Sequence, residues 1–287
     1  RRRGARRKLN SPTLRCGRFS LSLAKPLIMG VVNVTPDSFS DGGRFLDPEA
    51  AIAHAQQLIA EGADILDLGA ESSRPGAAAV IGAEEELRRL LPVLRALSDA
   101  PVPLSIDTIK PEVMRVVLAE GAAMINDINA LRARGALAAV AASDAAVCLM
   151  HMQGTPGTMQ QHPSYGDVVA EVKVFLIERV EAVRAAGIPL QRISIDPGFG
   201  FGKTLEHNLE LLRHLREFDA LGVPVLAGWS RKSSLGQITG KPAGDRLAAS
   251  IAAALIAAQN GAGILRVHDV AATRDALAVL SAVEKNP

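Results

Sequence analysis

Polar residues stand at the ends of several short apolar runs in this sequence, and their types suit a flat ligand rich in nitrogen. Asp107, Asn126 and Asp196 each follow such a run. Two carboxylates and an amide can accept hydrogen bonds from the N–H groups of a heterocycle. Because an unpaired carboxylate is costly to bury, these side chains must meet a ligand, solvent or a cation. We expect a ligand site; the alternative is an internal ion-pair network with Lys232 and Arg266.

A second group of residues has the chemistry of an anion site. Arg74, Arg266 and His268 lie near predicted strand ends, and a guanidinium can donate two parallel hydrogen bonds to phosphate oxygens. The spacing R-V-H places Arg266 and His268 on the same side of one strand. For His268, a structural hydrogen-bonding role is the alternative. Ser73 adds a hydroxyl donor, and Asn33 suits magnesium, which takes few protein ligands beside phosphate oxygens.

The segment 196–203 reads D-P-G-F-G-F-G-K, and its glycines have the wrong spacing for either common phosphate-binding loop. We expect instead a strand end that presents Asp196, followed by an apolar wall of Phe199 and Phe201. Met150, at the end of an earlier run, is expected to line the site or fill the core.

Eight apolar runs of strand length must position these residues. They cover residues 27–32, 65–66, 102–106, 123–125, 145–150, 193–195, 223–227 and 264–267. Continuous apolar runs suit strands that are buried on both faces of a parallel sheet, and helical patterns fill the intervals. Eight strand–helix units predict an α/β fold, a single-domain (β/α)8 TIM barrel, with its chemistry at the C-terminal ends of the strands.

Helix boundaries are marked by capping residues. Pro111 opens a helix that ends at Gly121, and Thr204 caps a helix that should end near Gly222. Long loops rich in glycine, proline and serine follow the first two apolar runs, as is typical of functional loops. The alternation over residues 14–23 predicts a short N-terminal hairpin that closes the bottom of the barrel.

The charge of the chain is unevenly distributed. Residues 1–18 hold eight Lys or Arg and no acidic residue, which leaves 24 basic and 30 acidic residues in the remainder. We expect residues 1–13 to be a disordered basic leader and residues 14–287 to be the barrel domain. A nucleic-acid-binding arm and a transit peptide are alternatives, but the body has neither a basic stripe nor interleaved aromatics.

The sequence also limits the possible cellular locations and binding partners of the protein. No secretory signal is visible, and the longest apolar helical stretch, residues 247–258, is too short to span a bilayer. Cys16 and Cys148 form neither a disulfide framework nor a zinc-binding pattern. We therefore expect a cytoplasmic protein with no membrane partner and small-molecule substrates.

Eight segments of the chain, in order, closely resemble the motifs of the dihydropteroate synthase family. They are MGVVNVTPDSFSDGG, DLGAESSRPGA, SIDT, INDI, LMHMQGTP, DPGFGFGK, GWSRKS and RVHDV. The resemblance implies a transferase that joins 6-hydroxymethyl-7,8-dihydropterin diphosphate to 4-aminobenzoate in folate biosynthesis and releases diphosphate with Mg²⁺. It also implies a cytoplasmic homodimer that is a target of sulfonamides.

The resemblance assigns site residues by motif. The pterin would be held by Asp107, Asn126, Asp196 and Lys232. The diphosphate would be held by Asn33, Ser73, Arg74, Arg266 and His268, with Asn33 also serving the metal. The aminobenzoate would be bordered by Phe39, Ser73, Pro75, Phe201 and Ser233. The catalytic set would be Arg266, His268, Lys232 and Asp107, supported by Asp67 and Met150.

Two positions depart from the family pattern: Ala70 replaces a glycine and Ser73 replaces a threonine. Ala70 matters only if that backbone needs a positive φ. The alternatives to a dihydropteroate synthase are another pterin-binding barrel, such as a methyltetrahydrofolate methyltransferase, and a catalytically silent pterin-binding paralogue. The first has little use for Arg266 and His268 as diphosphate ligands, and polar residues in every motif argue against the second.

Overall fold

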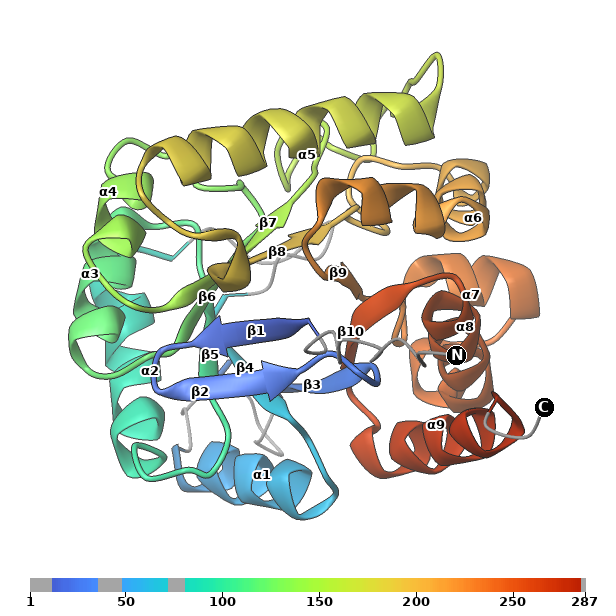
Figure 1. Cartoon of the computed structure of the whole chain (residues 1–287). Helices are drawn as coiled ribbons and strands as arrows, with labels where there is room; N and C mark the ends of the chain where they lie inside the picture. The colour runs from blue at the N-terminus through green and yellow to red at the C-terminus, as the bar shows by residue number, and fades with distance from the viewer. Residues whose placement is uncertain (1–11, 36–47, 72–80, 285–287) are drawn as a thin grey trace, which may run out of the picture.

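Eight parallel strands form a closed barrel with helices around it, in a computed structural model that describes residues 12–35, 48–71 and 81–284 (Figure 1). The strands follow one another around the barrel in sequence order, and the last pairs with the first. They are β3 (Leu27–Asn33), β4 (Ile65–Gly69), β5 (Leu104–Asp107), β6 (Met124–Asp127), β7 (Ala146–Met150), β8 (Ile193–Asp196), β9 (Val225–Ala227) and β10 (Ala262–Val267). The predicted (β/α)8 barrel is confirmed, and each of the eight apolar runs overlaps a strand.

The strands are buried on both faces because they separate two apolar layers. Alternate side chains such as Ile28, Leu66 and Ile106 point outward and form the main core with the helices. Their neighbours, such as Met29 and Ile65, point into the barrel. This arrangement explains why the sequence of each strand is apolar without alternation.

The outer layer consists of helices that connect successive strands. They are α1 (Pro48–Ala60), α2 (Ala83–Ala96), α3 (Pro111–Ala119), α4 (Ala136–Ala141), α5 (Val168–Ala185), α6 (Leu205–Arg213), α7 (Ser233–Thr239), α8 (Leu247–Gln259) and α9 (Val270–Glu284). Short 3-10 helices are η2 (Leu190–Arg192), η3 (Leu215–Leu221) and η4 (Ala243–Asp245). In the described part of the chain, no helix has both the length and the apolar composition needed to cross a membrane.

The predicted helix boundaries are mostly confirmed. The Thr204 side chain accepts a hydrogen bond from the His207 backbone N–H and forms a capping box. Gly222 ends the following segment with a φ of 70°. The segment is not one helix, however, because α6 ends at Arg213 and the chain continues as the tighter η3.

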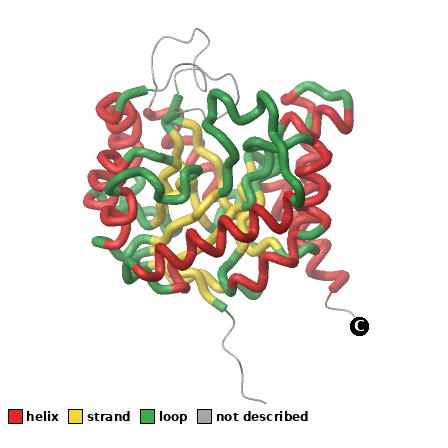
Figure 2. The backbone as a smooth tube through the Cα atoms, turned by 90° about the horizontal axis from the view of Figure 1, so that it is seen from above, coloured by secondary structure: helices red, strands yellow, loops and turns green. Residues whose placement is uncertain are grey.

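A hairpin closes the N-terminal end of the barrel. Strands β1 (Thr13–Cys16) and β2 (Phe19–Ser22) pair antiparallel and lie across the barrel opening in Figure 1. Leu14 and Cys16 are fully buried against the first inward-facing residues of the barrel strands. Figure 2 shows the hairpin at one end of the barrel. The hairpin prediction is confirmed, with β1 beginning at Thr13; residues 1–11 of the predicted leader lie outside the described residues.

Candidate active site

Inward-facing residues change from apolar at the hairpin end of the barrel to polar at the opposite end. On β6, Met124 belongs to the apolar cluster under the hairpin, whereas Asn126, two residues later, lines a cavity. The same step runs from Ile264 to Arg266 on β10. Residues two apart on a strand face the same side. The register of the parallel strands therefore places these polar side chains together at the C-terminal end of the barrel.

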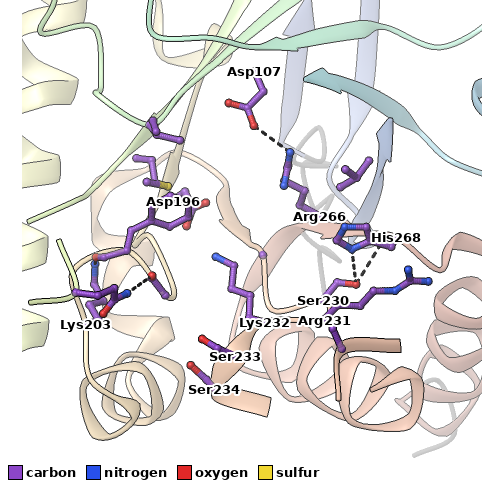
Figure 3. A pocket seen from close by; sticks show the side chains of 18 of the residues that line it. Asp107, Asp196, Lys203, Ser230, Arg231, Lys232, Ser233, Ser234, Arg266 and His268 are labelled. Atoms are coloured by element: carbon purple, nitrogen blue, oxygen red, sulfur yellow. Dashed lines mark hydrogen bonds and ion pairs between the residues drawn. The ribbon is translucent and has the colours of Figure 1, made fainter. Parts of the chain in front are cut away.

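A cavity of about 750 Å³ occupies this polar end of the barrel (Figure 3). That volume is typical of a small-molecule site. The structure brings most of the predicted site residues into its wall, and these are Asn33, Asp107, Asn126, Met150, Asp196, Phe201, Lys232, Ser233, Arg266 and His268. The central expectation from the sequence, that strand ends three, four and six converge, is confirmed.

Arg266 is held between two carboxylates in the floor of this cavity. Its Nε donates to Asp67 Oδ2 at 2.7 Å and its Nη2 donates to Asp107 Oδ2 at 3.1 Å. Asn126 Nδ2 also donates to Asp67 Oδ2, at 3.0 Å. The predicted supporting role of Asp67 agrees with this geometry, because the fully buried carboxylate orients both Asn126 and Arg266.

The ion-pair network considered as an alternative is thus present around Arg266, but it lines an open cavity rather than filling it. Burial raises the pKa of Asp107 to about 7, although the Arg266 guanidinium acts in the opposite direction. Among the described residues, nothing accepts a hydrogen bond from Arg266 Nη1. The side chain can therefore meet a ligand while it remains paired.

Asp196 and Lys232 form the opposite side of the cavity (Figure 3). Asp196 Oδ1 accepts a hydrogen bond from the Gly198 backbone N–H at 2.7 Å. Lys232 Nζ donates to the Phe199 carbonyl and lies 4.6 Å from the centre of the Phe201 ring. Burial raises the pKa of Asp196 and lowers the pKa of Lys232 to about 8. In the described ranges, no carboxylate forms an ion pair with Lys232, so both charged groups are available to a ligand.

His268 and Arg266 lie on the same side of β10 and its continuation, as the R-V-H spacing predicts (Figure 3). The Ser230 hydroxyl accepts from the His268 backbone N–H at 3.2 Å and lies 3.0 Å from His268 Nδ1. Arg231, with a φ of 59°, pairs with Asp269. Ser230 therefore orients the imidazole, as the structural interpretation predicts, while His268 also lines the cavity.

Several expectations need correction or lie beyond the described residues. Phe199 does not belong to the apolar wall: it is 1% exposed and packs on Trp229, with ring centroids 5.0 Å apart. Phe201, two residues later, does line the cavity. Ala70 does not adopt a positive φ, so the replacement of glycine there is tolerated. The predicted site residues outside the described ranges are Phe39, Ser73, Arg74 and Pro75.

Lys203 is the functional candidate that sequence reasoning missed. It lines the cavity although it is only 3% exposed, and burial lowers its pKa to about 7. Its position at the end of D-P-G-F-G-F-G-K was visible, but the sequence offered no partner for it. Gln160 and Arg246, on the loops beside the cavity, also line it and were not predicted.

Comparison with known proteins places this chain in a family. The family described as pterin binding enzyme matches residues 29–268. The dihydropteroate synthase of Escherichia coli (strain K12) is 50% identical over 264 residues, which cover 92% of this chain and 93% of that protein. That of Neisseria meningitidis serogroup B (strain ATCC BAA-335 / MC58) is 51% identical over 277 residues, covering 94% of this chain and 97% of its own.

Solved structures give the same result. Dihydropteroate synthase of Xanthomonas albilineans with 4-aminobenzoic acid is 56% identical and superposes with a TM-score of 0.90, covering 96% of this chain and 100% of that one. The enzyme from the same organism in complex with 7,8-dihydropteroate is 53% identical with a TM-score of 0.88 and the same coverage. The chain therefore belongs to the pterin binding enzyme family and, within it, to the dihydropteroate synthases.

Proposed function

We propose that this protein joins 6-hydroxymethyl-7,8-dihydropterin diphosphate to 4-aminobenzoate and releases 7,8-dihydropteroate and diphosphate. The observation that carries the proposal is one cavity that combines acidic and amide acceptors with cationic groups. Relatives about half identical in sequence are dihydropteroate synthases, and solved relatives hold 4-aminobenzoic acid or 7,8-dihydropteroate. The volume of the cavity and the chemistry of its lining agree with those two ligands.

The pterin would occupy the floor of the cavity. Asp107, Asn126 and Asp196 offer acceptors from β5, β6 and β8, and Lys232 offers a donor. Two carboxylates and an amide oxygen in the wall of one cavity match the N–H and NH₂ donors of a pterin edge. Phe201 and Ser233, further along the same wall, would border the aminobenzoate, with the Ser233 hydroxyl near its carboxylate.

The diphosphate would meet Arg266, His268 and Asn33 on the side of the cavity formed by β10 and β3. Arg266 Nη1 and the imidazole of His268 supply donors to phosphate oxygens. Magnesium fits this part of the site through Asn33, because the ion prefers oxygen ligands and takes most of them from water and phosphate. When bound, it would neutralise charge on the diphosphate.

We propose a reaction in which the C–O bond breaks first and the amine attacks afterwards. The bonding electrons leave with the diphosphate, and the pterin ring stabilises the cationic methylene. The lone pair of the aryl amine then forms the new C–N bond, and the amine proton passes to diphosphate or solvent. Arg266 and His268 stabilise the charge that grows on the leaving group. No residue is needed as a general base, since the aryl amine is neutral at physiological pH.

Measuring diphosphate release with each substrate omitted in turn tests this proposal. We expect release and 7,8-dihydropteroate formation only when both substrates and Mg²⁺ are present. Binding of pterin without turnover would indicate a catalytically silent paralogue. Methyl transfer from methyltetrahydrofolate to a corrinoid would indicate the methyltransferase alternative. Either result would overturn the proposed reaction.

We also propose that the enzyme is a cytoplasmic homodimer, as the resemblance implies. Helix α8 is apolar nearly all round although it lies in the outer layer, and Leu247 and Ile256 on it are exposed. Val279 and Val283 on the neighbouring α9 are exposed as well. Exposed apolar side chains on adjacent helices suit an interface with a second copy. Light scattering should return twice the mass of the chain, and the mass of one chain would contradict the proposal.

A further inference from the structure

Lys203 places an ammonium group inside the protein next to the pterin site. It lies in the loop between β8 and α6, and its Nζ is 3.0 Å from His151 Nδ1 and donates to the Phe201 carbonyl at 3.0 Å. In the described part of the chain, no carboxylate forms an ion pair with it. Lys203 is only 3% exposed and its hydrogen-bond partners are neutral, so burying its charge costs free energy. Such a cost suggests that the charge has a function.

His151 holds this ammonium group in place. Burial and then the neighbouring Lys203 lower the pKa of His151 to about 3, so the ring is neutral and Nδ1 can accept from Lys203. The His151 backbone N–H donates to the Asp196 carbonyl at 3.0 Å. A Cβ on Gly198 would lie 1.9 Å from the His151 carbonyl oxygen. The end of β7 and the loop after β8 are therefore locked together, with Lys203 at their junction.

We propose that Lys203 is a positioning residue of the pterin site, whose buried positive charge keeps Asp196 ionised so that it can accept hydrogen bonds from the pterin. The proposal rests on the proposed function, because it takes Asp196 as a pterin ligand. Lys203 acts on the ligand through Asp196, which begins the same loop. His151 links the two residues, because its Nδ1 contacts Lys203 Nζ and its backbone N–H donates to the Asp196 carbonyl.

The charges around the pair support this assignment. Lys203 faces Asp196 and Lys232, and the neutral His151 imidazole contacts it. Asp196 in turn faces Lys232, Lys203 and Arg266 and lies near the Cys148 thiol. Burial raises the pKa of Asp196, and Lys203 is one of the cations that oppose this rise. Burial lowers the pKa of Lys203 to about 7, so its charge is present in mild acid and is lost in mild alkali.

This charge gives a pH-dependent signature that a purely structural role would not produce. Without Lys203, the carboxyl of Asp196 keeps its proton to a higher pH, so pterin binding should weaken most in mild acid. We expect Lys203→Met to weaken binding of 6-hydroxymethylpterin severalfold near pH 6, where a pKa change of about one unit sets a ceiling of about tenfold, and less than about twofold near pH 8.5. Isothermal titration calorimetry at both pH values measures this difference.

Matched variants separate the charge from the hydrogen bonds. Lys203→Gln keeps donors for His151 and the Phe201 carbonyl but removes the charge, so it should show the same pH-dependent loss. Tyr165→Phe removes the hydrogen bond to the Gly202 carbonyl, 2.7 Å long, in the same loop, and any loss should be equal at both pH values. Circular dichroism checks that each variant is folded.

The two proposals fail in different ways. If the unchanged protein binds no pterin at either pH, the proposed function is wrong. If it binds pterin, and Lys203→Gln either binds equally well or loses the same factor at both pH values, the role of the Lys203 charge is wrong. The Lys203→Gln result decides the question even if Lys203→Met does not fold.

Discussion

At the scale of single residues, Arg266 connects two groups of side chains that the sequence suggested were separate. It was predicted to hold the diphosphate, apart from the acidic residues that hold the pterin. In the structure, its guanidinium pairs with Asp67 and Asp107. A charged group that balances buried carboxylates cannot be removed without affecting them.

We therefore expect Arg266→Met to weaken pterin binding about tenfold or more, as well as to reduce turnover, because two carboxylates lose their cation. Calorimetry with 6-hydroxymethylpterin and a diphosphate-release assay measure the two effects. Arg95→Met, which removes an arginine that pairs with Glu120 away from the cavity, is the control. A loss of turnover with unchanged pterin binding would restore the separate roles expected from the sequence.

Asp107 should cost stability at neutral pH. Its folded pKa, raised by burial to about 7, exceeds its ordinary value of 3.8. Below about pH 4 the carboxyl is protonated in both the folded and the unfolded protein, and Asp107 carries no penalty. As the pH rises from about 4 to about 7, the unfolded protein loses this proton more readily than the folded protein, so the free energy of unfolding falls. Asn resembles the protonated acid, so Asp107→Asn should raise Tm by a few degrees more at about pH 8 than at about pH 5. Calorimetry measures both, with exposed Asp99→Asn as the control; a gain that does not depend on pH would contradict the raised pKa.

Residue types and strand register predicted much of the site. Asp107, Asn126 and Asp196 converge because each is the last inward-facing residue of its parallel strand. Side-chain directions in the loop after β8 were harder to predict, because residues of a loop do not alternate between two faces as residues of a strand do. Phe201 lines the cavity, whereas Phe199 is in the core. Lys203 was missed since its partner His151 is 52 residues away in sequence and has no distinctive spacing.

At the scale of elements, the loop between β8 and α6 depends on glycine at a close approach. Gly198 has a φ of 74°, and an added Cβ would lie 1.9 Å from the His151 carbonyl oxygen. Gly198→Ala should therefore lower the free energy of unfolding by about 3 kcal/mol or more, combining backbone strain with a clash. It should also impair activity, because Asp196 begins this loop.

Gly187 offers a matched control for that substitution. It has a φ of 92°, and no other group lies within 4 Å of the position that a Cβ would take. Gly187→Ala should therefore cost only about 1 to 2 kcal/mol, from backbone strain alone, and leave activity intact. Urea denaturation measures both variants. Equal losses in the two would show that the contact with His151 is unimportant.

Elements were predicted best where a capping residue marked their ends. Pro111 and Thr204 open α3 and α6 as expected, because proline at the first turn and a capping hydroxyl act locally. The division of the predicted helix into α6 and η3 was not predictable from apolar spacing, since both helix types place residues three apart on one face and the segment spans too few turns to separate the two periods.

At the scale of the whole molecule, the barrel separates stability from chemistry. The hairpin closes one end with Leu14 and Cys16, and the cavity occupies the other. Leu14→Ala should lower the free energy of unfolding by about 2 to 5 kcal/mol while kcat and KM stay unchanged. Exposed Thr13→Ala on the same strand should cost little. A change in KM for Leu14→Ala would show that the two ends of the barrel are coupled.

The most direct test of the whole account is a crystal structure of the protein soaked with 6-hydroxymethylpterin. We predict that the ring lies in the cavity at the C-terminal ends of the strands, with its N–H groups donating to Asp107 and Asp196 and its edge against Asn126. A pterin bound elsewhere on the protein, or bound in the cavity without contact to these three side chains, would contradict the account.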